Sequence, residues 1–139
     1  MQKSTIARII LALLLMASYV GMDAQAQQKR PPPALQAEFD TFIARFRAAL
    51  KDNDMTAVAA MTKFPILIGS ELRDEAHFRK QGYRRLFTAR MRDCIQKTRA
   101  VYDRDPMGND NYSFFCGQLI LIMTRTPSGF LFADTGVND

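Results

Sequence analysis

Apolar residues recur at steps of three and four between residues 34 and 51, with charged and polar residues between them. This spacing places the apolar residues on one face of an α-helix. We therefore predict a helix over about 34–51. Its apolar face holds six large residues: Leu35, Phe39, Phe42, Ile43, Phe46 and Leu50.

A second, shorter helix is predicted after a polar turn at 51–54. Asp54 can cap its first turn, because an aspartate side chain accepts hydrogen bonds from the free N–H groups at a helix start. Val58 and Met61 supply its apolar face. Pro65 disfavours helical geometry at the residue before it, so the helix should end there. The apolar segment 66–68 then predicts a short strand.

The segment 74–97 has the pattern of two further helices. Asp74 can cap a short helix that ends near Gly82. A longer helix over about 83–97 would turn six residues toward the core: Tyr83, Leu86, Phe87, Met91, Cys94 and Ile95.

The C-terminal part of the chain has the composition of β-strands. We expect a short strand at 100–102, a loop at 103–111, a long strand at 112–125 and a returning strand at 130–137. Every residue from Leu119 to Met123 is apolar, which indicates a central strand that is covered on both faces.

Helices followed by antiparallel strands predict an α+β domain, with the N-terminal helices packed on one face of a small curved antiparallel sheet. The long first helix, the short second helix ending in "KFPILIG" and the later helix before a terminal hairpin resemble the cystatin-like, or nuclear-transport-factor-two-like, superfamily. The resemblance covers most of residues 35–137. It implies this fold but no single activity, because the superfamily contains both enzymes and binding modules.

The first 26 residues have the pattern of a cleaved secretory signal peptide. Lys3 and Arg8 precede the apolar segment 9–17, and the sequence Ala-Gln-Ala ends at Ala26. The apolar segment is shorter than the roughly 20 residues that a membrane-spanning helix needs. We therefore expect an exported chain, periplasmic or secreted, without a transmembrane span after cleavage. A proline-rich tether at 27–33 would join it to a single domain at 34–139.

The charge of the chain is positive and unevenly distributed. The whole sequence has a formal charge of +5, which cleavage of the signal peptide would reduce to +4 by removing two basic residues and one acid. An exported protein does not meet nucleic acid, so the expected partners are acidic proteins or anionic components of the cell envelope.

The chain contains two cysteines, Cys94 and Cys116. An even number in an exported protein favours a disulfide, and these two allow one intramolecular pairing. Cys94 falls on the core face of the 83–97 helix, and Cys116 in the strand on which that helix would pack. Two separate buried thiols are the alternative. A nucleophilic Cys116 with His77 as its base is the third, although no sequence signal points to an oxyanion site.

The segment 78–99 holds eight basic residues and one acid. On a continuous helix, Arg85, Arg92 and Arg99 would fall at seven-residue steps on a face away from the core. Together with Arg84 they are the predicted contacts for an anionic partner, because the guanidinium group suits phosphate and carboxylate. A solvated face whose charges are paired within the fold is the alternative.

Polar residues that could line a ligand pocket between the helices and the sheet are Asp40, His77, Tyr83 and Tyr112. No phosphate-loop, dinucleotide-binding, nucleophile-elbow or zinc motif occurs in the sequence. Residues 103–111 resemble a calcium loop, but Met107 and Phe114 stand where oxygen ligands are needed. We therefore predict no metal and no cofactor.

The sequence favours a binding domain that meets an anionic protein or envelope component through the arginine-rich segment. A ligand carrier or enzyme with a pocket between helices and sheet is one alternative. An inhibitor or immunity-type protein, which would also be small, exported and disulfide-stabilised, is another.

Overall fold

A computed structural model describes residues 30–138 of the chain. The chain divides into two units, Met1–Arg30 and Pro31–Asp139, and the described residues lie almost entirely in the second. The predicted signal peptide at 1–26 and the predicted tether up to residue 29 lie outside the described residues.

The long first helix is confirmed. Helix α2 spans Pro33–Lys51, with a proline in its first turn, where the missing N–H is not needed. All six residues of the predicted apolar face are buried, together with Ala49. Pro33, which was predicted to be the last residue of the tether, belongs to α2.

The second helix and the segment after it also follow the predictions. Helix α3 spans Met55–Ala60, and the Asp54 side chain accepts a hydrogen bond from the N–H of Ala57. Strand β1 spans Ile66–Ile68 and pairs in antiparallel register with β2, Glu71–Arg73. Strand β2 was not predicted, because its three residues have no apolar pattern.

Helical structure then runs on without a break past Gly82, where an end was predicted. Helix α4 spans Glu75–His77, the π-helical turn η2 spans Phe78–Gly82, and α5 spans Tyr83–Leu86. Gly82 has helical dihedral angles and is buried against β1. A Cβ atom there would lie 2.8 Å from Ile68 Cδ1, so the glycine permits close packing and does not end the helix.

The predicted continuous helix over 83–97 is wrong, because it is broken between α5 and helix α6, Ala89–Lys97. Phe87 has non-helical dihedral angles and is almost completely buried. Its ring packs edge-to-face against Phe46 and Phe132. The next residue, Thr88, starts α6 by accepting a hydrogen bond from the N–H of Met91.

The C-terminal part forms a four-stranded antiparallel sheet in the order β3-β4-β5-β6. The strands are Val101–Arg104, Asp110–Cys116, Leu119–Thr126 and Gly129–Val137. The predicted single strand at 112–125 is wrong, because the chain turns at 117–118, where Gly117 has a φ of +67°. The apolar segment after this turn is β5, which pairs with β4 and β6 and is central as predicted. The predicted cover on both faces is wrong, because Ile120 and Ile122, which alternate with the buried Leu121 and Met123, remain partly exposed.

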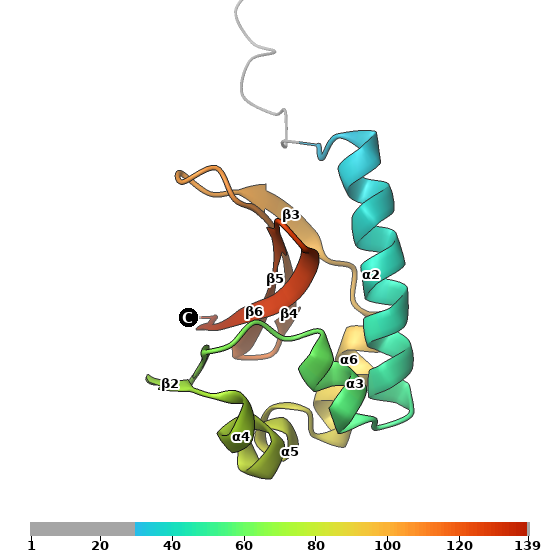
Figure 1. Cartoon of the computed structure of the whole chain (residues 1–139). Helices are drawn as coiled ribbons and strands as arrows, with labels where there is room; N and C mark the ends of the chain where they lie inside the picture. Colours follow the sequence, from blue (N-terminus) through green and yellow to red (C-terminus); the bar gives the residue numbers. More distant parts are fainter. Residues whose placement is uncertain (1–29, 139) are drawn as a thin grey trace, which may run out of the picture. The chain divides into compact units, whose positions relative to one another are not determined.

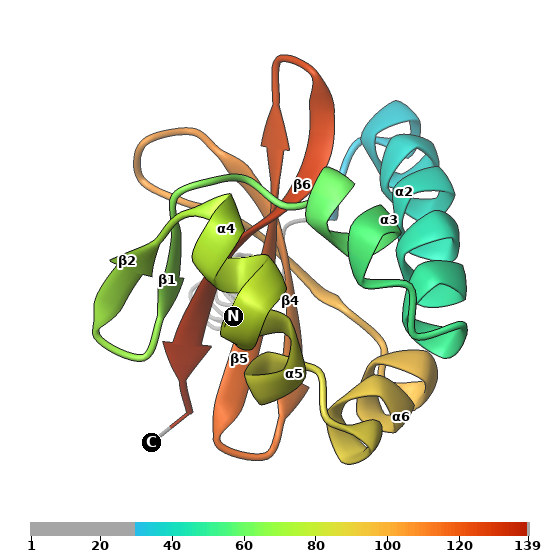
Figure 2. The same cartoon turned by 60° about the horizontal axis from the view of Figure 1, so that its bottom comes forward.

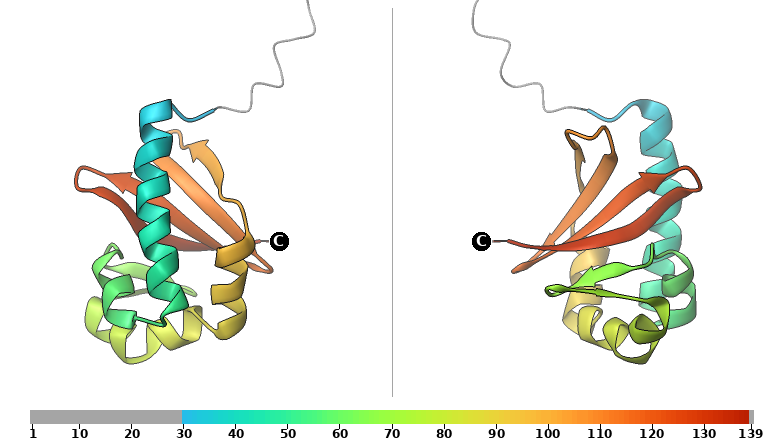
Figure 3. Two further views of the ribbon diagram at one scale, coloured as in Figure 1. Left: turned by 90° about the vertical axis from the view of Figure 1, so that its right-hand side faces the viewer. Right: turned by 60° about the vertical axis from the view of Figure 1, so that its left-hand side comes forward.

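The free edge of β6 is partly covered by the chain that precedes and includes β1. Phe132 donates its N–H to Met61 O and accepts from the N–H of Lys63. Further along β6, the Thr135 hydroxyl donates to Leu67 O. The helices α2, α3, α5 and α6 all lie toward one face of the curved sheet (Figures 1 and 2), and no helix of residues 30–138 lies on the other face (Figure 3). The predicted α+β class, with helices on one face of a small curved antiparallel sheet, is confirmed.

Candidate functional site

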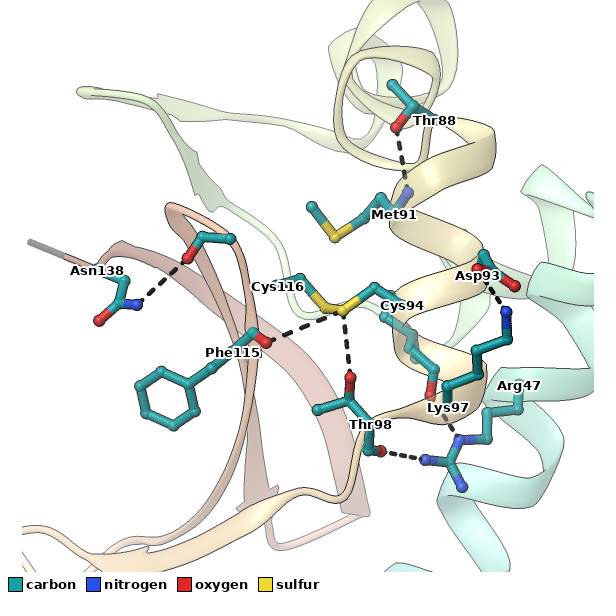
Figure 4. The surroundings of a disulfide bond; sticks show 12 residues. Arg47, Thr88, Met91, Asp93, Cys94, Lys97, Thr98, Phe115, Cys116 and Asn138 are labelled. Atoms are coloured by element: carbon teal, nitrogen blue, oxygen red, sulfur yellow. Dashed lines mark hydrogen bonds and ion pairs between the residues drawn. A yellow bond between two sulfur atoms is a disulfide. The ribbon is translucent and has the colours of Figure 1, made fainter.

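Helix α6 is tied to the sheet by the predicted disulfide. Cys94 of α6 and Cys116 at the end of β4 are bonded, with an S–S distance of 2.05 Å (Figure 4). No free cysteine remains in the described chain. The alternatives of two buried thiols and of a nucleophilic Cys116 are therefore both excluded in this state of the protein.

A second attachment holds the C-terminal end of α6 to α2. Arg47 donates from Nε to Ile95 O at 2.9 Å and from Nη2 to Thr98 O at 2.7 Å (Figure 4). In return, Gln96 Nε2 donates to Arg47 O at 2.8 Å. Carbonyls at a helix C-terminus lack partners within the helix, and a positive charge there is favourable. The guanidinium group also lies 5.6 Å from the centroid of the Phe114 ring.

This role of Arg47 was not predicted from the sequence. The residue is one of several polar residues on α2, and only the tertiary fold brings it to the end of α6. The disulfide and Arg47 together fix the position of α6, which carries Arg90, Arg92 and Lys97.

Three of the eight basic residues of segment 78–99 form hydrogen bonds or ion pairs within the fold. Arg79 pairs with Glu75 at 2.7 Å, and Lys97 pairs with Asp93 at 2.8 Å. Arg92 is only partly exposed and donates from Nη1 to Phe87 O at 2.8 Å, so it ties α6 to the break that precedes it. These three side chains are therefore less available to a partner.

The other five basic residues are exposed. Within residues 30–138, no carboxylate lies within 4.0 Å of any of them. Arg84 makes one long hydrogen bond, from Nη2 to Lys80 O at 3.3 Å. We call this set the basic surface, and it consists of Lys80, Arg84, Arg85, Arg90 and Arg99.

Within the described chain, segment 79–99 carries a net positive charge and the remaining residues carry a net negative charge. Residues 79–99 hold eight basic residues and one acid, a formal charge of +7. The other residues of 30–138 hold eight basic residues and eleven acids, a formal charge of −3. Four of the five basic-surface residues lie on η2, α5 and α6, which lie together at one end of the unit (Figure 2).

The predicted arrangement of Arg85, Arg92 and Arg99 on one helical face is wrong. Arg85 belongs to α5, Arg92 belongs to α6, and Arg99 follows the end of α6. Because the helix is broken at Phe87, these three residues do not share one helical face despite their seven-residue spacing. The basic surface includes Lys80 and Arg90, which were not predicted, and it does not include Arg92.

The four predicted pocket residues lie in separate places. Tyr112 donates its hydroxyl to Gln36 Oε1 at 2.8 Å, and Gln36 Nε2 donates to Asp40 Oδ1 at 2.7 Å, so these two predicted residues are linked on α2 and β4. Tyr83 lies on α5 and donates its hydroxyl to Asn53 Oδ1 at 3.0 Å, whereas His77 lies on α4. No common site is formed by all four.

Burial is the main cause that raises the pKa of Tyr112, to about 12, and the nearby negative charge of Asp40 adds to it. Burial likewise raises the pKa of Tyr83. Both phenols are therefore protonated near neutral pH and act as hydrogen-bond donors in the two links described above.

Aromatic rings occupy the space between α2 and the sheet. Phe39 of α2 stacks on Tyr112 with ring centroids 3.6 Å apart, and Phe130 packs edge-to-face against it at 5.3 Å. Further along α2, Phe46 contacts Phe132 at 6.1 Å. Every buried side-chain nitrogen and oxygen in the described residues has a hydrogen-bond partner. No polar group in this layer is left for a ligand to satisfy.

The calcium-like loop is organised by its own side chains. Asp105 accepts hydrogen bonds from the N–H and Nδ2 of Asn109 and from Asn111 Nδ2. These bonds lower the pKa of Asp105. Within residues 30–138, no three histidine, cysteine, aspartate or glutamate side chains gather as metal ligands.

Neither a family model nor a curated protein sequence matches the chain. Among the described residues, no helix has the length and apolar character needed to cross a membrane.

Proposed function

We propose that this chain is an exported binding domain that engages an anionic protein or an anionic envelope component through the basic surface. The observation that carries the proposal is the exposure of five basic side chains without acidic partners among the described residues. Solvated charges normally lie among charges of the opposite sign, whereas here the segment 79–99 holds a single acid. Such a concentration of one sign attracts and orients a partner of the other sign.

The attachment of α6 supports the same function. A binding surface works best when its side chains stand on rigid elements, because less conformational entropy is lost on binding. The disulfide and the Arg47 contacts hold α6 to β4 and to α2. The apolar residues of α6 face this core, with Ile95 fully buried, so the helix presents its polar side to a partner.

A ligand carrier or enzyme has less support. The aromatic rings between α2 and the sheet fill the place where such a pocket would lie. Only Asp40 and Tyr112 of the four predicted pocket residues are linked by hydrogen bonds. The order of elements supports the proposed likeness to the cystatin-like and nuclear-transport-factor-two-like superfamily, and binding modules are among its members.

Charge reversal on the basic surface tests the proposal. Arg85→Glu/Arg90→Glu should abolish capture of the partners that the wild-type chain retains from envelope extracts. Arg45→Glu/Lys51→Glu is the matched control, because both residues are exposed on α2 and the change in net charge is the same. The control should retain the partners. Equal capture of partners by all three proteins would refute the proposal. Equal loss of capture in both variants would also contradict it, because binding would then depend on net charge alone.

A further inference from the structure

Four of the five basic-surface residues lie at the end of the unit formed by η2, α5 and the first turn of α6, which we call the basic end. The large apolar residues of this end do not reach its surface. Tyr83, Leu86 and Phe87 are buried, and Met91 packs against the core. The exposed side chains from residue 80 to residue 90 are Lys80, Gln81, Arg84, Arg85, Thr88, Ala89 and Arg90.

The composition of these exposed side chains distinguishes between kinds of partner. Protein interfaces gain most of their affinity from aromatic and other large side chains that fill pockets on the partner. Between residues 80 and 90 the largest exposed apolar group is the methyl group of Ala89. A membrane that contains anionic phospholipid needs no such anchor, because its negative surface potential attracts each nearby lysine or arginine directly. The basic end therefore fits a lipid surface better than it fits an acidic protein.

The four charges of the basic end stand on neighbouring elements. Lys80 and Arg84 are four residues apart, and Arg84 Nη2 donates to Lys80 O at 3.3 Å. Arg85 follows on α5, and Arg90 lies in the first turn of α6, which begins three residues after α5 ends (Figure 2). Phospholipids diffuse within the membrane plane, so their phosphates can gather beside these charges whatever the spacing. A folded protein partner would have to match the spacing with fixed carboxylates.

We infer that the anionic partner is the surface of a membrane that contains anionic phospholipid, and that the chain docks on it with the basic end. This inference rests on the proposed function, because it names the partner of the same basic surface. Asp93, the one acid in 79–99, pairs with Lys97 at 2.8 Å. Arg99 follows the far end of α6, roughly 13 Å along the helix from Arg90, so it lies outside the basic end.

The charges of the remaining residues favour the same orientation. Outside 79–99 the described residues carry a formal charge of −3. An anionic membrane therefore repels the rest of the unit while it attracts the basic end. The turn that holds Asp52 and Asp54 borders the basic end, because Tyr83 of α5 donates its hydroxyl to Asn53. The loop between β3 and β4 lies at the opposite end of the unit (Figure 1).

Co-sedimentation with lipid vesicles tests the docking surface. Each basic side chain near an anionic membrane strengthens binding about fivefold at physiological salt. The wild type should therefore prefer vesicles of equal parts phosphatidylglycerol and phosphatidylcholine to pure phosphatidylcholine vesicles by roughly 600-fold. Arg85→Glu/Arg90→Glu should bind the anionic vesicles at least about 25-fold more weakly, because two attractive charges become repulsive.

Arg45→Glu/Lys63→Glu is the matched control, since both residues are exposed and lie outside η2, α5 and α6. It has the same net charge as the first variant and should keep most of the binding. All three proteins should have the same circular dichroism spectrum, because every replaced side chain is exposed. Equal weakening in both variants would overturn the inference, since binding would then not depend on the basic end.

Tryptophan fluorescence tests the orientation, because the sequence contains no tryptophan of its own. Gln81→Trp puts a reporter on the basic end, and Met107→Trp puts one at the tip of the β3–β4 loop, where Met107 is 88% exposed. Phosphatidylglycerol vesicles should shift the emission of the Gln81→Trp protein to shorter wavelength, and brominated lipid should quench it. The Met107→Trp protein should respond to neither. Equal responses of the two proteins would overturn the proposed orientation.

A wild type that binds both kinds of vesicle equally would overturn the inference about lipid. Capture from envelope extracts then decides separately about the proposed function. If Arg85→Glu/Arg90→Glu still loses the captured proteins, the basic surface binds an acidic protein and only the inference about lipid is wrong. If that variant captures the same proteins as the wild type, the proposed function is wrong as well.

Discussion

Removal of the Cys94–Cys116 disulfide should destabilise the domain by a predictable amount. The two cysteines are separated by 22 residues in the sequence. Closing a loop of this length lowers the entropy of the unfolded chain by an amount worth about 3 kcal/mol at 25 °C. For a domain of this size we expect the Tm to fall by about 10–15 °C.

Cys94→Ser/Cys116→Ser is the suitable variant, and urea and thermal unfolding followed by circular dichroism are the assays. The native spectrum should be kept, because the Arg47 contacts still hold α6 to α2. The urea midpoint should fall without a change of fold, and reduction of the wild type should give a similar loss. Two free thiols in the native, unreduced protein, or a loss below about 1 kcal/mol, would contradict the reasoning.

Two further predictions concern Arg47 and Tyr112. Arg47→Met keeps the apolar stem but leaves Ile95 O and Thr98 O without their donor, so urea unfolding should show a loss of about 2–3 kcal/mol. Arg45→Met, on the exposed side of α2, should change stability by less than about 0.5 kcal/mol, and equal losses would refute the role of Arg47. Because the pKa of Tyr112 is about 12 in the folded chain, its contribution to stability is complete below pH 10 and is lost as the pH rises from 10 to 12. Between pH 10 and 12, the free energy of unfolding of the wild type should fall by about 2–3 kcal/mol more than that of Tyr112→Phe. Parallel pH profiles for the two proteins would contradict the raised pKa of Tyr112.

The parts of the fold that depend on local pattern could be predicted from the sequence. The apolar spacing in 34–51 fixed the helix and its buried face, since no other arrangement hides these side chains. Asp54 and Asp74 were recognised as caps, because capping joins residues three positions apart. The disulfide followed from the cysteine count and from the predicted neighbourhood of helix and strand.

The parts that depend on contacts between distant segments could not be predicted. Phe87 leaves the helix to fill a place beside Phe46 and Phe132, which a helical pattern alone does not reveal. The turn at Gly117 was hidden, because both strands it joins are apolar. Arg47 and Arg92 looked like other surface arginines, although each donates to a carbonyl elsewhere in the fold.

Two of these errors, the break at Phe87 and the role of Arg92, changed the candidate site. The excess of positive charge was visible in the sequence, but which arginines remain free depends on the break between α5 and α6. The prediction included Arg92, which is bound to Phe87 O, and left out Arg90, which is exposed.

The most direct test of the account is the salt dependence of partner binding. The affinity of the wild type for a captured partner should fall steeply as salt is raised, because exposed charges are screened. Arg85→Glu/Arg90→Glu should bind at least about tenfold more weakly at low salt and show little further dependence, while Arg45→Glu/Lys51→Glu should follow the wild type. Affinities that do not respond to salt, or that fall equally in both variants, would contradict a function based on the basic surface.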